Sequence, residues 1–296
     1  MKKIYLAVIV FLILISAMSC DSNLPYPTDE IKRGVVVDIT RITGTDGVLE
    51  DGITDGNYKV RLAIPEQQGD YSFLSHIQLL AVLEKEDGSF DSKVIIDNIV
   101  DLPVDLDLNM ADVYSEFGLT APSLGETMFF TTNAVLNDGY VVQGWTSVSR
   151  FNNMAFVGWR IDGRAYSYNV RYMVACPLVL EDFVGTATVI RDDWLGGSYN
   201  VEIAMESDTQ LSVTGMLHGA ATVPLLLTVD PTDHSVSFPK QILVPSPTWW
   251  AGNPYKDFAL EGSGVINACE GTISFSTTAT VDLGSFGDGV QFIISK

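Results

Sequence analysis

The chain has little positive charge and few side chains that bind transition metals. Only 17 of its residues are Lys or Arg, against 37 Asp or Glu, so the formal net charge is -20. This is the wrong sign for a protein that neutralises phosphate groups, and we expect no nucleic-acid partner. With 3 His and 3 Cys, the sequence also lacks the clusters from which zinc and iron–sulfur sites are built. An apolar content of 47% nevertheless allows a well-filled core and excludes a disordered chain.

Motifs that carry a known catalytic mechanism are also missing. The sequence has no Gly-x-Ser-x-Gly elbow, no phosphate-binding loop and no Cys-x-x-Cys pair. His76, His218 and His234 are far apart in sequence, and we interpret each as an ordinary strand or turn residue. Carboxylates are numerous enough for a glycoside hydrolase, but the sequence selects no acid and base pair. We therefore predict a protein that is not an enzyme, with glycoside hydrolysis as the alternative.

The N-terminus has the pattern of an export signal. Lys2 and Lys3 precede an apolar run over 4–15, which is shorter than the ~20 residues of a membrane-spanning helix. Ala17-Met18-Ser19-Cys20 is similar to the lipobox of bacterial lipoproteins, which implies cleavage before Cys20 and acylation of that residue. We predict a signal peptide over 1–19 and a lipidated, Pro-containing tether over 20–32 that holds the protein on a membrane.

The rest of the chain consists of short alternating runs separated by Gly, Asp, Asn and Pro, which is typical of antiparallel strands. We predict an all-β protein with an Ig-like β-sandwich over 33–176 and an eight-stranded antiparallel meander or lipocalin-like barrel over 177–296. A sandwich of two four-stranded sheets is the alternative for the second domain. One helix is expected over 110–117, capped by Asn109. The expected strands cover 34–43, 57–64, 75–86, 93–100, 127–136, 139–148, 165–175, 185–190, 198–205, 211–217, 223–229, 235–243, 258–267, 272–281 and 290–295.

A Pro- and Gly-rich loop over 245–255 is the main candidate for ligand binding. It contains Trp249, Trp250, Asn253 and Tyr255. Indole rings stack on the C–H faces of sugars, and an amide side chain can bond sugar hydroxyls, so this loop could be a carbohydrate platform. The alternative is that the rings close the barrel mouth as part of its core.

Two further groups of residues are weaker candidates. Asp46, Asp51 and Asp55 lie in a Gly-rich loop and could supply oxygen ligands to Ca²⁺, although a charged hairpin loop is the alternative. No other cofactor is expected. Cys176 and Cys269 remain after the lipid anchor, and they form either a disulfide or two separate thiols.

Several stretches carry a family resemblance. They are Cys20 with its tether, 33–36, 183–189, 229–231 with 238–241, and 264–275. Together they resemble two-domain Bacteroidetes-type surface lipoproteins encoded beside SusC/SusD-like outer-membrane nutrient importers. The resemblance implies an outer-membrane lipoprotein that captures glycan or peptide beside an importer, and it supplies no catalytic residues. The membrane face stays open, and a structural or assembly lipoprotein without a small ligand is the alternative function.

Overall fold

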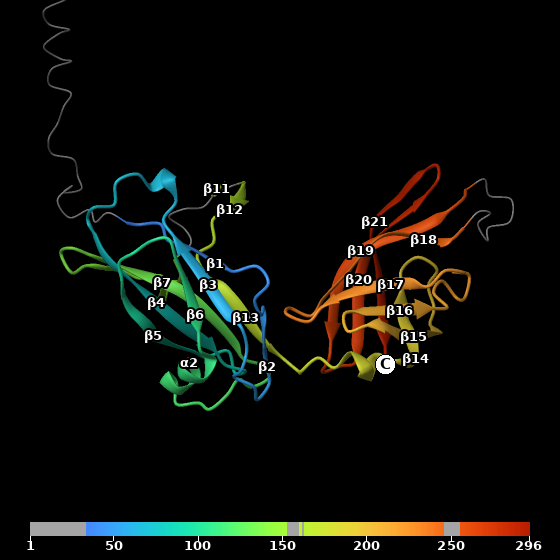
Figure 1. The fold of residues 1–296 in the computed structure, drawn as a ribbon, viewed down its shortest axis with the longest axis horizontal. Helices are drawn as coiled ribbons and strands as arrows, with labels where there is room; N and C mark the ends of the chain where they lie inside the picture. The colour runs from blue at the N-terminus through green and yellow to red at the C-terminus, as the bar shows by residue number, and fades with distance from the viewer. Residues whose placement is uncertain (1–33, 153–159, 162, 246–254) are drawn as a thin grey trace, which may run out of the picture. The chain divides into compact units, whose positions relative to one another are not determined.

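The computed structural model describes residues 34–152, 160–161, 163–245 and 255–296. The predicted signal peptide, Cys20 and the tether over 20–32 lie outside these residues. Residues 36–296 form one compact unit. Its secondary structure is almost entirely strand (Figure 1), which confirms the predicted all-β fold class. None of the described helices is long and apolar enough to cross a membrane.

The first part of this unit contains two main sheets. One has three strands in the order β1-β3-β6, and the other has the order β2-β13-β7-β4-β5 with β8 beside β7. Every pairing is antiparallel except β13–β2, which is parallel. The strands of these sheets are β1 (Asp38–Arg41), β2 (Val48–Glu50), β3 (Tyr58–Ala63), β4 (Leu74–Glu84), β5 (Phe90–Ile99), β6 (Val104–Leu108), β7 (Thr127–Leu136), β8 (Val141–Val142) and β13 (Val170–Ala175).

Alternation along β3 sets which face of the smaller sheet is buried. Tyr58, Val60 and Leu62 are buried, while the residues between them face outward, as the period of a strand requires. On that outer face Lys59 pairs with Asp107 at 2.6 Å and Arg61 pairs with Asp105 at 2.9 Å. The two carboxylates of β6 therefore lie on a solvent-exposed face.

Aromatic side chains join the two sheets across their shared core. The Tyr172 ring of β13 meets Tyr58 of β3 and Phe130 of β7 edge to face, at centroid distances of 5.6 and 5.8 Å. Helix α2 (Met110–Glu116) begins where Asn109 Oδ1 accepts a hydrogen bond from Ala111 N at 3.0 Å, so the predicted cap is confirmed. Short elements complete this part: η2 (Glu66–Gln68), β9 (Trp145–Thr146), β10 (Arg150–Phe151), β11 (Arg160–Ile161) and β12 (Arg164–Ala165).

The strand expected over 139–148 does not form as one element. It is divided into β8 and β9 at Gly144, whose N–H donates to Asn133 Oδ1 at 3.1 Å. A Cβ atom at Gly144 would lie 2.1 Å from the Thr132 carbonyl oxygen, so only glycine permits this approach of the two backbones. The three-residue strand β2 was not expected, because nothing in its short sequence distinguishes it from the surrounding loop.

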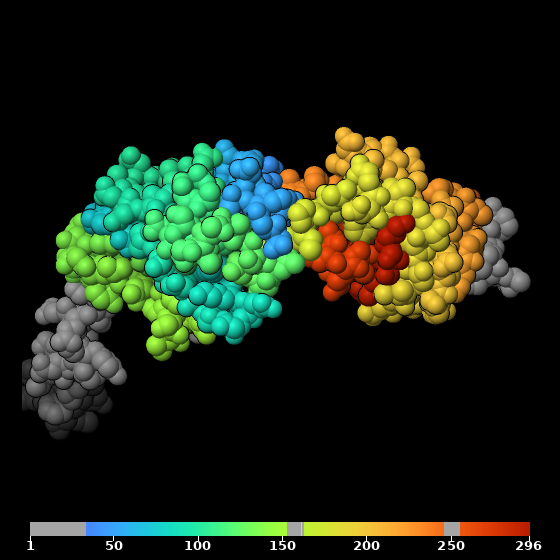
Figure 2. Space-filling model, turned by 90° about the horizontal axis from the view of Figure 1, so that it is seen from below, coloured from blue at the N-terminus to red at the C-terminus, as the bar shows by residue number. Residues whose placement is uncertain are grey.

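The second part is a closed antiparallel barrel of eight strands, which confirms a barrel in place of two four-stranded sheets. Each strand pairs with the next in sequence, and β21 pairs with β14 to close it. Figure 2 shows this closure at the surface, where the red end of the chain lies against the yellow stretch. A short helix, η4 (Leu180–Phe183), precedes the strands β14 (Gly185–Asp192), β15 (Tyr199–Ser207), β16 (Gln210–Thr214), β17 (Leu225–Asp230), β18 (Ser235–Val244), β19 (Phe258–Asn267), β20 (Thr272–Val281) and β21 (Gly284–Ser295).

Apolar side chains fill the barrel interior. Phe275 stacks on Phe292 and meets Phe238 edge to face, both at centroid distances of 5.4 Å. Eight strands leave an interior wide enough for side chains alone, and here one large apolar cluster occupies it. On β19, a Cβ atom at Gly264 would lie 1.9 Å from the Ser274 carbonyl oxygen, so glycine is required for β20 to pack this closely.

A disulfide joins the segment between the sheets and the barrel to the barrel itself. Cys176, which follows β13, is bonded to Cys269 in the turn between β19 and β20, with 5.2 Å between their Cα atoms. The bond closes a loop of sequence separation 93. The predicted division of the chain at residue 176 falls in this linker, between the last strand of the sheets and the first strand of the barrel.

Candidate functional site

A pocket of about 340 Å³ lies at one end of the smaller sheet, and we take it as the candidate binding site. It is enclosed by the loop that leads into β3, the end of β6 and the start of α2. Its volume is at the small end of the range for small-molecule sites, roughly 300–1,000 Å³. The lining residues are Thr54, Asp55, Gly56, Asn57, Tyr58, Asp107, Leu108, Asn109 and Met110.

The loop that forms one wall is held by an aspartate. Asp46 Oδ2 accepts a hydrogen bond from Asn57 N at 2.6 Å, and Asp46 N donates to the Asn57 carbonyl oxygen at 3.0 Å. Gly56 packs on the Tyr58 ring so closely that a Cβ atom would lie 2.3 Å from Cε2. A side chain at position 56 would therefore push the loop away from the Tyr58 ring.

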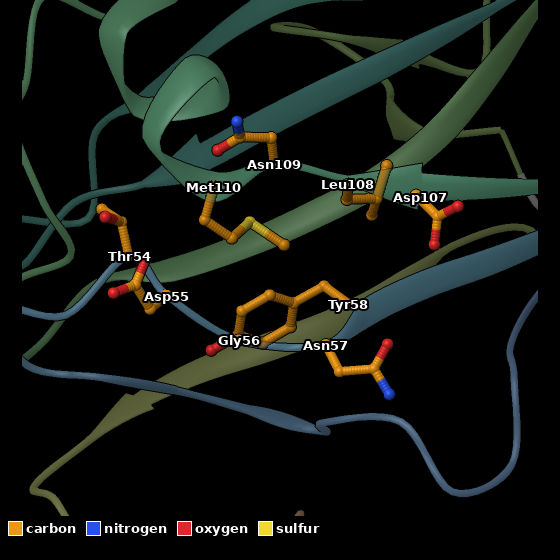
Figure 3. Close-up of a pocket in the computed structure, with 9 residues that line it drawn as sticks. All are labelled: Thr54, Asp55, Gly56, Asn57, Tyr58, Asp107, Leu108, Asn109 and Met110. Carbon is orange, nitrogen blue, oxygen red and sulfur yellow. The ribbon is translucent and has the colours of Figure 1, made fainter.

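The pocket has an apolar floor. Tyr58, Leu108 and Met110 are buried, and Figure 3 shows the Tyr58 ring facing the Met110 side chain. Burial raises the pKa of Tyr58 to about 12, and the nearby carboxylates of Asp46 and Glu50 add to this effect. The phenol therefore keeps its proton at neutral pH, and the ring, only 4% exposed, supports the pocket from beneath.

The rim of the pocket is polar. Asp55, Asn57, Asp107 and Asn109 are all exposed, and Figure 3 places Asp55 and Asp107 on opposite sides of the Tyr58 ring. Asn109 Oδ1 is used by the helix cap, so its Nδ2 group is the part that can donate to a ligand. Carboxylate and amide oxygens supply acceptors. The site therefore combines donors and acceptors at the rim with an apolar floor.

The predicted calcium ligands are not gathered around one point. Asp46 binds the backbone of Asn57, while Asp51 Oδ1 accepts from Leu124 N at 3.0 Å. Asp55 lines the pocket. Across the part of the chain that the structure describes, no group of three or more His, Cys, Asp or Glu side chains could hold a metal ion. Calcium binding stays a prediction.

The aromatic loop is described only at its end. Trp249, Trp250 and Asn253 lie outside the described residues. The Tyr255 ring meets Phe286 edge to face at 5.2 Å, and Phe286 in turn contacts Trp194 at 5.1 Å. Tyr255 therefore belongs to an aromatic cluster of the barrel, and both interpretations of the loop, platform and plug, stay predictions.

The histidines lie in separate parts of the structure. His76 is on β4, 3.2 Å from Asp97, and His218 stacks against the Tyr199 ring of β15. His234 is buried in the turn between β17 and β18. These positions agree with their interpretation as strand and turn residues.

Sequence reasoning found only parts of the pocket. It selected Asp55 as a metal ligand and Asn109 as a helix cap. It did not select Tyr58, because a tyrosine at the start of a strand is ordinary in a core. The chain matches no protein-family model, no curated protein and no solved structure.

Proposed function

We propose that this chain is a non-catalytic, lipid-anchored protein of the outer membrane that binds a glycan beside a nutrient importer. The observation that carries the glycan part is the pocket with Tyr58 in its floor and amides and carboxylates on its rim. The anchor and the compartment rest on the leader sequence and the residues around Cys20.

The chemistry of the pocket suits a sugar ring. A sugar presents hydroxyl groups along its edge, and the exposed lining of this pocket consists mainly of groups that can bond them. Asp55 and Asn57 supply acceptors on one wall, and Asn109 supplies a donor on the other. A pocket of about 340 Å³ suits the end of a glycan better than an internal segment.

The ion pair at Asp107 suits a role in orienting a ligand. A glycosidase needs two carboxyl groups that flank the bond to be cleaved. Asp55 and Asp107 are the two carboxylates of this pocket, and Asp107 is held by Lys59 at 2.6 Å. An engaged carboxylate can orient a hydroxyl group, whereas a general acid must be free to protonate a leaving group.

The pocket can be tested by calorimetric titration of the purified full-length protein with maltohexaose, cellohexaose and mannohexaose. We expect one of these to bind, and Asn57→Ala to weaken that binding about tenfold, because the variant removes both a donor and an acceptor. Asp105→Ala is the matched control, since Asp105 is an exposed carboxylate of β6 outside the pocket. Equal effects of the two substitutions would contradict the assignment of the pocket.

The anchor needs a separate test. We expect the Cys20→Ala variant to leave the membrane fraction, because acyl chains would provide its attachment. The measurement is the distribution of the variant between the membrane and the released fractions. Retention of Cys20→Ala on the membrane would contradict the lipoprotein assignment without affecting the pocket.

A further inference from the structure

The outer face of the larger sheet carries a continuous group of aromatic rings and arginines, which we call the arginine–aromatic face. It comprises Phe90, Phe129, Trp145, Arg150, Phe151 and Arg171. Phe129 lies 5.0 Å from Phe151, and Phe151 is the cross-strand partner of Trp145. Trp145 stacks on Phe90 at a centroid distance of 6.2 Å. The rings therefore form one connected surface over β5 and β7, and all of them except Trp145 are partly exposed.

Each end of this surface carries a guanidinium group. Arg150 Cζ lies 4.1 Å from the centroid of Phe90, and Arg171 Cζ lies 6.0 Å from the centroid of Phe129. Both arginines are exposed. Their positions are those of cation–π pairs, in which the flat cation lies against the ring and its N–H groups stay available at the edges.

These two arginines differ from others in the chain. Arg41, Arg61, Arg164 and Arg191 each form an ion pair with an aspartate. No ion pair joins Arg150 or Arg171 to a carboxylate within the described residues. Glu84 lies on the same face, in cross-strand register with Phe90 and Thr127, and it is not within ion-pair distance of either guanidinium. The chain has a net charge of -20, yet among the described residues no carboxylate pairs with either of these two guanidinium groups.

Two local features describe how the face is built. Arg150 has φ of 60°, a left-handed conformation that is unfavourable for a side chain of this size, yet the turn before it is fixed by a 2.6 Å bond between the Thr146 and Ser149 hydroxyls. Trp145 is only 8% exposed, and its Nε1 donor has no hydrogen-bond partner among the described residues.

We propose that the arginine–aromatic face binds an acidic oligosaccharide. The sugar rings would lie on Phe129 and Phe151, and a carboxylate or sulfate group of the sugar would meet the fork of N–H donors on Arg150 or Arg171. The choice of a glycan rests on the proposed function. The site is separate from the pocket at Tyr58, and its two arginines select an anionic sugar.

The negative charge of the whole protein does not exclude an acidic ligand. Exposed charges farther apart than the Debye length, about 8 Å at physiological ionic strength, are largely screened. The ligand would therefore respond mainly to the two guanidinium groups that it touches. We therefore expect the binding of an acidic oligosaccharide to weaken as salt is added.

The test is calorimetric titration of the full-length protein with three hexasaccharides: hexagalacturonate, which carries carboxylates, a sulfated carrageenan hexasaccharide, and neutral maltohexaose. We expect an acidic hexasaccharide to bind at least about tenfold more tightly than maltohexaose at this face, because charged hydrogen bonds are stronger than neutral ones. A preference for hexagalacturonate would assign a carboxylate ligand, and a preference for the carrageenan would assign a sulfate ligand.

Substitutions locate the binding. We expect Arg150→Ala and Arg171→Ala each to weaken it about tenfold, and Arg150→Lys to restore only part of it, because lysine keeps the charge but loses the fork. Arg61→Ala is the matched control, since Arg61 is an exposed arginine on the other sheet. Binding that is equally weakened by Arg61→Ala would overturn the proposal, as would the absence of binding by both acidic sugars.

The outcome is independent of the pocket. Asn57→Ala is expected to leave acidic-sugar binding at this face unchanged. Loss of neutral-sugar binding in Asn57→Ala, together with no acidic-sugar binding by the unmodified protein, would retain the proposed function and overturn this inference. Acidic-sugar binding that depends on both arginines, without binding at the pocket, would support this inference and contradict the pocket.

Discussion

The barrel and the two-sheet part differ in how their strands are connected. Each barrel strand pairs with its neighbour in sequence, and one apolar cluster fills the interior. The strands of the two-sheet part pair across long stretches of chain, as in the parallel pair of β2 and β13. Both parts bury polar side chains, among them Asp38, Thr131 and Asn133 in the sheets and Asp192, Ser212 and Thr277 in the barrel.

The difference indicates a division of roles. Side chains fill the interior of the barrel, so it can bind a ligand only at its ends or on its outer surface. The two-sheet part has irregular connections, and these create both the pocket at Tyr58 and the arginine–aromatic face. Buried polar groups in either part must be held by specific hydrogen bonds, as Asp192 of the barrel is by Trp194 N and Leu195 N, while the apolar cluster of the barrel is held by packing.

The largest loss of stability is expected from a substitution in the barrel core. Phe275→Ala removes a fully buried ring that contacts Phe238 and Phe292. We expect the free energy of unfolding to fall by about 3–5 kcal/mol, the usual cost of such a cavity. Chemical denaturation measures this change. Val265→Ala is the control, because Val265 is 52% exposed on the outer face and its loss should cost less than about 0.5 kcal/mol. Equal losses in the two variants would contradict the packed interior.

In the two-sheet part the corresponding test is a buried polar group. Asp38 is 3% exposed, and its carboxylate accepts hydrogen bonds from Ser167 N at 3.0 Å and from the Arg164 guanidinium. Asp38→Ala leaves the Ser167 N–H without its partner, whereas Arg164 can turn toward solvent. We expect a loss of about 1–3 kcal/mol in the free energy of unfolding.

A matched control for Asp38 is the exposed ion pair on β6. Asp105→Ala should change stability by less than about 1 kcal/mol, because exposed pairs contribute little. Denaturation of both variants gives the comparison. A loss in Asp38→Ala no larger than that in Asp105→Ala would show that the two-sheet part does not depend on its buried polar groups.

The sequence predicted the barrel better than the two-sheet part for a physical reason. The barrel strand β20 alternates strictly between buried and partly exposed residues, and the expected bounds of β19 and β20, 258–267 and 272–281, match the structure. In the two-sheet part, pairing brings together segments that are distant in sequence. The expected strand over 139–148 fails at Gly144, where contact with Thr132 decides the backbone path.

The same limit applies to the candidate sites. The pocket exists because β3 pairs with β6 and places Tyr58 opposite Leu108, a register that no local pattern specifies. Asn109 could be identified as a helix cap from its own segment, since capping depends on neighbours in sequence. The arginine–aromatic face could not be identified in this way, because Arg150 and Phe90 belong to different strands and meet only in the folded protein.

The smallest expected effect tests whether the barrel also depends on a buried polar group. His234 lies in the turn between β17 and β18, is 4% exposed and has φ of 57°. Burial lowers the pKa of His234, although the carboxylates of Glu50 and Asp233 offset part of this effect. The folded protein therefore holds this histidine neutral at a pH where the unfolded chain binds a proton.

The sign of the pH dependence follows from that difference. The stabilisation is present above the unfolded pKa of about 6.5 and is lost as the pH falls toward the folded value. We expect this contribution to be less than about 1 kcal/mol and to disappear in His234→Asn, since asparagine tolerates a positive φ and does not titrate. The measurement is the free energy of unfolding of both proteins between pH 7.5 and pH 5. Hydrogen bonds from Thr232 lower the pKa of Asp230 below the ordinary value of an aspartate. The stabilisation that Asp230 provides is therefore lost only at a pH more acidic than the range measured for His234. The same slope in both proteins would contradict a lowered pKa of His234 in the folded protein.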